Sequence, residues 1–158
     1  MSDLQFSTFE APSAAEFIDV LRRSTLGERR PLEDMTCMQQ MTAHANLWVT
    51  CRADGILVGV ARCLTDFGYV CYLADLAVDQ NFARRGIGRR LIEETCGRLG
   101  PEAKIVLIAA PKAVDYYPHI GFTQHPSAWT LEVAGKNLSC SQMDAARGSA
   151  PWAGRPKL

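Results

Sequence analysis

Three apolar runs in the middle of the chain, over residues 47–52, 56–65 and 69–78, are rich in Val, Ile, Leu and Cys. Asp54-Gly55 separates the first two runs, and this dipeptide favours a tight hairpin because such a turn needs positive φ angles. Asp66-Phe67-Gly68 makes a second short turn before the third run. Turns of this length join neighbouring antiparallel strands. We therefore predict a three-stranded antiparallel meander.

Other segments with strand or helix patterns lie on both sides of the meander. Before it come a short strand over residues 6–9, a helix that begins at a capping box formed by Ser13 and Glu16, and a second helix after Glu33. After it come a helix with an apolar stripe from residue 87 to residue 99, a strand over 104–110, a short helix over 113–119 and a last strand over 129–133. The predicted order is β-α-α-β-β-β-α-β-α-β.

This order indicates the class of fold. The strand, helix and strand between residues 69 and 110 should form a parallel, right-handed unit. The strand over 104–110 lacks alternation, so we expect it to be buried on both faces. We predict a single-domain α/β (α+β) fold with a mixed, mostly antiparallel central sheet and helices on both faces. The domain should span residues 1–134, and residues 135–158 should form a C-terminal tail that is irregular or packs on the domain or on a partner subunit.

Composition limits the partners and the compartment. Lys+Arg and Asp+Glu both total 17, so no overall charge draws the chain to nucleic acid or to a membrane surface. The N-terminus lacks a signal-peptide pattern, and the apolar runs are shorter than the roughly 20 residues of a membrane span. The six cysteines contain no Cys-x-x-Cys pair, so we expect buried free thiols and no metal site. These features predict a cytoplasmic protein.

One glycine-containing turn stands out between the third strand and the following helix. Its sequence is Arg84-Arg85-Gly86-Ile87-Gly88-Arg89, and a helix start of this kind favours an anion such as pyrophosphate. A Walker A loop would need Gly-Lys-Ser/Thr, and a dinucleotide fingerprint would need a third glycine where Leu91 stands. A helix start with a solvated basic face is the alternative interpretation, because two glycines alone are weak evidence.

Two motifs in the correct order carry a resemblance to a known family. Residues 76–79 followed by 84–92 resemble the acetyl-CoA signature of the GCN5-related N-acetyltransferase (GNAT) superfamily, and residues 113–122 resemble that family's A-x-x-F-Y-x-x-x-G-F element. The resemblance covers roughly residues 4–133. Ala83 stands where the family usually has Gln or Arg. Ala110 stands where the family often has Asn. Main-chain contacts to the cofactor are therefore better supported than side-chain contacts.

The resemblance implies residue roles. Acetyl-CoA would be the cosubstrate, with its pantetheine along the third strand and its phosphates at the glycine turn. The implied cofactor-binding residues are Leu76, Ala77, Val78, Arg84, Arg85, Gly86, Ile87, Gly88 and Arg89. Tyr117 matches the tyrosine that many members use as the general acid. The alternatives are that Tyr117 only packs in the core or that Tyr116 points into the cleft instead.

The general base is the second implied catalytic position. Asp75 is a charged residue inside an apolar strand, and an unpaired buried carboxylate is costly. It therefore either faces the cleft, where it or Tyr72 would end a water chain that accepts the amine proton, or pairs with a structural arginine such as Arg62.

The resemblance finally implies the activity. We expect an acyltransferase that moves an acetyl group from acetyl-CoA to a primary amine of a small molecule by direct attack in a ternary complex. A homodimer is also an expectation, since members of the family often dimerise. Two alternatives stay open, namely acetylation of protein lysines or N-termini, and a non-catalytic CoA-binding sensor or interaction module.

Overall fold

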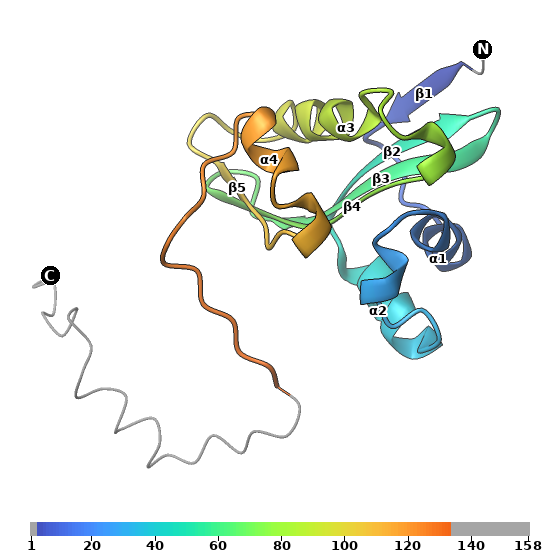
Figure 1. The fold of residues 1–158 in the computed structure, drawn as a ribbon, viewed down its shortest axis with the longest axis horizontal. Coiled ribbons are helices and arrows are strands. Elements are labelled where there is room, and N and C mark those ends of the chain that lie inside the picture. The colour runs from blue at the N-terminus through green and yellow to red at the C-terminus, as the bar shows by residue number, and fades with distance from the viewer. Residues whose placement is uncertain (1–2, 134–158) are drawn as a thin grey trace, which may run out of the picture. The chain divides into compact units, whose positions relative to one another are not determined.

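A computed structural model describes residues 3–133, and the chain divides into a compact unit that ends at Phe122 and a second unit that begins at Thr123. The strands are β1 (Leu4–Ser7), β2 (Leu47–Ala53), β3 (Ile56–Thr65), β4 (Val70–Val78) and β5 (Lys104–Val106). The helices are α1 (Ala14–Arg23), α2 (Met35–His44), α3 (Ile87–Cys96) and α4 (Tyr116–His119), with short 3-10 turns η1 (Gly27–Arg29), η2 (Gln80–Phe82) and η3 (Pro111–Ala113). Figure 1 shows their arrangement.

The five strands form one sheet in the order β1-β2-β3-β4-β5. All neighbours are antiparallel except β4 and β5, which are parallel and are connected through α3. The hairpin between β2 and β3 turns at Asp54 and Gly55, with φ angles of 50° and 81°. The predicted meander and the parallel unit that follows it are both confirmed.

Helices cover both faces of the sheet, as predicted (Figure 1). On one face, Phe17 and Leu21 of α1 and Met38 of α2 are fully buried against Trp48 and neighbouring residues of the sheet. On the other face, a second core holds the apolar residues of α3, namely Ile87, Leu91 and Ile92. The capping box at α1 is present, because the amide of Glu16 donates to the Ser13 hydroxyl and the Glu16 carboxylate accepts from the Ser13 amide.

The structure corrects three local predictions. Residues 129–133 form no strand and pair with none within the described part of the chain, and Trp129 is 93% exposed. Strand patterning alone cannot satisfy backbone groups that have no neighbouring strand. β5 ends at Val106 and is not buried on both faces, because Val106 and Ile108 are exposed on the face opposite α3. The predicted helix over 113–119 is two short turns, η3 and α4.

The cysteines follow the expected pattern in part. Cys51, Cys63 and Cys71 are buried free thiols, whereas Cys96 is exposed and Cys37 is half-buried. Burial raises the pKa of the Cys51 thiol to about 11. Cys140 and the predicted tail lie outside the described residues. Within residues 3–133, no helix is both long and apolar enough to cross a membrane.

The path of β4 positions the site. Its pairing with β5 stops at Tyr72 and Val106, yet β4 continues to Val78. A register shift between Arg62 and Cys63 of β3 leaves Ala74 of β4 as an extra residue, which is a β-bulge. After the bulge, Leu76 packs toward the core beneath α3, while Ala77 packs toward α1 and α2. The last residues of β4 therefore have one edge that β5 does not pair with.

Candidate functional site

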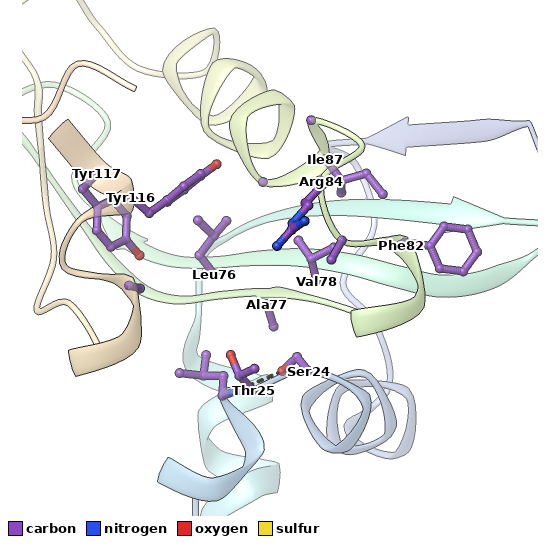
Figure 2. A pocket seen from close by; sticks show the side chains of 15 residues that line it. Ser24, Thr25, Leu76, Ala77, Val78, Phe82, Arg84, Ile87, Tyr116 and Tyr117 are labelled. Carbon is purple, nitrogen blue, oxygen red and sulfur yellow. Dashed lines mark hydrogen bonds between the residues drawn. The ribbon is translucent and has the colours of Figure 1, made fainter. Parts of the chain in front are cut away.

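A cavity of about 280 Å³ lies along this unpaired edge of β4. Residues from four segments line it: Ser24, Thr25 and Leu26 after α1; Leu76, Ala77 and Val78 of β4; Phe82, Ala83, Arg84, Gly86, Ile87 and Gly88 before and within α3; and Ala113, Tyr116 and Tyr117 near α4. Figure 2 shows these residues around the opening. Because residues from both faces of β4 contribute, the cavity reaches past the strand from the α3 side to the α1 side.

The glycine turn at one end of the cavity has an unusual backbone. Arg84 and Gly86 have φ angles of 61° and 76°, in the left-handed region that costs little only for glycine. Gly86 caps α3 without a side-chain hydrogen bond. The amides of the first turn of α3 therefore stay available to a ligand, and the helix dipole makes this position favourable for an anion.

Gly59 of β3, which the sequence patterns did not single out, sets the position of α3. A Cβ atom on Gly59 of β3 would lie 2.7 Å from Cγ2 of Ile87. The missing side chain allows the first residue of α3 to rest directly on the sheet. Gly59 stands in an ordinary apolar strand, so no local signal distinguishes it.

The loop between β4 and α3 is anchored by Asp79. This carboxylate is buried, accepts from the Asn81 amide at 2.8 Å and forms an ion pair with Arg23 of α1. Arg23 also donates to the carbonyl of Leu57 at 2.7 Å. The glycine turn therefore follows a loop that is tied to α1 and to β3.

The basic residues of the turn have different surroundings. The guanidinium of Arg85 lies 4.7 Å from the centre of the Phe82 ring. Arg89 and Arg90 form ion pairs with Glu93 and Glu94. Arg84 alone among them lines the cavity, and within residues 3–133 it has no hydrogen bond or ion pair. Figure 2 shows its side chain directed into the opening near Val78.

The implied cofactor-binding residues divide accordingly. Those that line the cavity are Leu76, Ala77, Val78, Arg84, Gly86, Ile87 and Gly88. Arg85 and Arg89 belong to the same turn but do not line it. Most of the lining side chains in this set are apolar or absent, and main-chain contacts to a cofactor stay a prediction.

Two adjacent tyrosines also line the cavity, beside the start of α3. Their ring centres lie 5.5 Å apart, and Tyr117 also packs edge-on against Phe122. The Tyr116 hydroxyl lies 3.0 Å from the point that a Cβ atom on Gly88 would occupy, so it points toward the start of α3 (Figure 2). Burial raises the pKa of both phenols above the usual value, and for Tyr117 the neighbouring Tyr116 adds to the effect.

Asp75 does not line the cavity, and its side chain is completely buried. Its two carboxylate oxygens accept from Nε of Arg62 and from Nε of Arg30, each at 2.5 Å. Arg30 also donates to the carbonyl of Ala74, the bulge residue, at 3.0 Å. The pairing with Arg62 was one expected alternative. Arg30 was missed, because it lies 45 positions away and no local pattern connects the two.

The chemical groups around the cavity are few. Among the described residues that line it, none is acidic and none is a histidine. The hydroxyls are those of Ser24, Thr25 and the two tyrosines, and the Ser24 hydroxyl is already bonded to Leu21 and Leu26. Tyr72 is not a lining residue. Within residues 3–133, no group of His, Cys, Asp and Glu side chains is arranged to hold a metal ion.

The mixed sheet, the unpaired strand edge and the helix start beside it define an α/β domain with a cavity at the point where two parallel strands separate. A family model described as "Acetyltransferase (GNAT) domain" matches residues 24–143. The chain belongs to the GNAT acetyltransferase family. Enzymes of this family use acetyl-CoA.

Known proteins with similar sequences or folds agree with this assignment. The chain is 28% identical, over 101 residues, to an uncharacterised N-acetyltransferase, ycf52, of Gracilaria tenuistipitata var. liui; the match covers 62% of this chain and 56% of that protein. A GNAT family acetyltransferase of Streptococcus pneumoniae shares the fold with a TM-score of 0.69 at 18% identity, over 85% of this chain and all of that one.

A third similar protein was solved with a ligand. It is the aminoglycoside N-acetyltransferase AAC(6')-Iy in complex with CoA. Its TM-score is 0.62 at 15% identity, and the match covers 84% of this chain and 95% of that one. At this level of identity the likeness concerns the fold alone.

Proposed function

We propose that this chain transfers an acetyl group from acetyl-CoA to a primary amine of a small molecule, with both substrates bound at once. The observation that carries the proposal is the cavity along the unpaired edge of β4, which the glycine turn and Tyr117 both line. A cavity lined from both faces of β4 would give a donor and an acceptor room on either side of the strand. Membership of the GNAT family supports the choice of donor.

The residues present fit the donor. Acetyl-CoA supplies an acyl group activated as a thioester, together with a charged pyrophosphate. The amides at the start of α3 and the Arg84 guanidinium are donors suited to the pyrophosphate. The edge of Leu76, Ala77 and Val78 that faces away from β3 would hold the pantetheine, and Arg85 and Arg89 would add positive charge beside the turn. An amide near Leu76 or Ala77 would polarise the thioester carbonyl.

Tyr117 is the proposed general acid. Because burial raises the pKa of its phenol, the hydroxyl keeps its proton at neutral pH and can donate it to the departing thiolate. We propose that the amine proton passes to water. Asp75 would have a positioning role, because its two arginine partners would hold the bulge of β4 and the segment after η1 in place.

The proposal is tested by thiol release from acetyl-CoA with a panel of small amines and of peptides. We expect turnover with small amines and a large loss of turnover for Tyr117→Phe. Turnover with peptides alone would favour the protein acetyltransferase alternative. Tight CoA binding in calorimetry without turnover of any acceptor would contradict the proposal and favour the sensor alternative.

A further inference from the structure

Among the residues that the structure describes, the cavity is lined by no group that readily accepts a proton from an ammonium ion. Arg84 is the one charged side chain among the described lining residues, and it faces the end that fits the donor phosphates. The four hydroxyl groups are weak bases, and the two phenols keep their protons at neutral pH. A cationic amine would therefore enter without an anionic partner, which is costly in a partly enclosed site.

The charged groups on the surrounding elements do not change this conclusion. Asp75 of β4 is buried between two arginines. Glu28 of η1 lies 3.7 Å from Lys112 of η3, and Glu33 pairs with Arg22 of α1 at 3.1 Å. Asp115 and His119 of α4 are exposed and do not line the cavity, and Arg29 and Arg30 near η1 are cations. Each of these carboxylates, except exposed Asp115, therefore already has a basic partner.

We propose that the acceptor is a small amine of low pKa that carries no second cation, such as the α-amino group of an amino acid amide; this inference rests on the proposed acetyl transfer. An α-amino group has a pKa of about 8 and an alkylamine about 10.4, so at pH 7 their neutral shares differ by roughly 200-fold. An amine that arrives neutral needs no enzymic base before it attacks.

The chemistry balances with the groups present. The nitrogen lone pair of the neutral amine forms the bond to the carbonyl carbon, and the bond between that carbon and sulfur breaks. The nitrogen then releases one proton to water, and the thiolate takes one from Tyr117, which regains it from solvent. The products are an N-acetyl amide and a free thiol, so no oxidant, reductant or metal is needed.

The first test compares alaninamide, 2-phenylethylamine and 1,4-diaminobutane as acceptors across pH. We expect kcat/KM, calculated on total amine at pH 7, to be at least about 10-fold higher for alaninamide than for the diamine. The pH at which kcat/KM levels off should follow the pKa of each acceptor. An inflection at one pH for all acceptors, or a preference for the diamine, would overturn the inference. Absence of thiol release with every acceptor would instead contradict the proposed acetyl transfer on which it rests.

The second test introduces the missing charge. Thr25 is exposed and lines the cavity after α1 (Figure 2), so Thr25→Asp adds a carboxylate of similar size, and Thr25→Asn is the matched neutral control. We expect Thr25→Asp to raise kcat/KM for the diamine relative to alaninamide by about 5-fold or more, with the ratio unchanged in Thr25→Asn. An equal ratio in both variants would contradict the view that the missing carboxylate sets the acceptor class.

Discussion

At the scale of single residues, the two adjacent tyrosines are distinguished by direction. The Tyr116 hydroxyl points at the start of α3, whereas Tyr117 is the more buried phenol and packs on Phe122. Tyr117→Phe should lower kcat by about 100-fold, a typical contribution of a general acid. Because burial raises the pKa of Tyr117, the phenol loses its proton only above the usual titration range of tyrosine. We therefore expect an alkaline limb of kcat there in the wild type and in Tyr116→Phe. A wild-type limb that begins near pH 8 would assign the acid to another group.

Among the arginines of the turn, Arg84 should contribute most to donor binding. It lines the cavity without a partner among the described residues, while Arg89 is bonded to Glu93 at 3.0 Å on the exposed side of α3. A charge-assisted hydrogen bond is worth about 1.5–3 kcal/mol, so Arg84→Ala should raise KM for acetyl-CoA by about 10-fold or more. Arg89→Ala is the matched control, with an expected change of about 3-fold or less. Equal effects would indicate that the turn acts through its summed charge.

At the scale of elements, the packing of α4 on α3 depends on the small size of Gly88. A Cβ atom there would lie 3.0 Å from the Tyr116 hydroxyl but 3.7 Å from the ring carbon that bears it. Gly88→Ala should weaken CoA binding several-fold, because Tyr116 must move. In a Tyr116→Phe background, Gly88→Ala should weaken CoA binding much less, because the Tyr116 hydroxyl oxygen is absent. Calorimetry of the two single variants and the double variant measures this coupling, and additive effects would contradict it.

Local sequence patterns predicted the elements whose causes are local. The capping box of Ser13 and Glu16 and the Asp54-Gly55 turn place a helix start and a hairpin from neighbouring residues alone. The two motifs then predicted which strand, turn and tyrosines line the cavity, and the roles of the individual residues are predictions.

What the sequence did not predict depends on residues that meet only in the folded chain. Arg30 and Asp75 are 45 positions apart in the sequence but form a hydrogen bond in the fold. Gly59 lies in an ordinary apolar strand, and its missing side chain lets α3 pack directly on the sheet. The prediction for residues 129–133 was wrong for a related reason. A strand also requires a neighbouring strand, and the local sequence carries no information about that neighbour.

At the scale of the whole molecule, Asp75 connects three separate parts of the compact unit: β4, Arg62 of β3 and Arg30 after η1. In Asp75→Asn the amide group places its own donors against one guanidinium, and the positive charge of both arginines is left without an anion. Removal of one member of a buried ion cluster costs about 3 kcal/mol or more, which in a chain of this size lowers Tm by roughly 6–12 °C.

The matched control for this change is Glu93→Gln. It removes an ion pair in which both side chains are at least half exposed, and such pairs contribute about 1 kcal/mol or less. Thermal unfolding measures the stability of each variant. Thiol release, measured at a temperature where each variant is folded, reports the catalytic effect separately. We expect Asp75→Asn to lose stability and to keep the pH dependence of the wild type. A Tm within 1 °C of the wild type together with an altered pH profile would place Asp75 in the proton transfer itself, which its two arginine partners argue against.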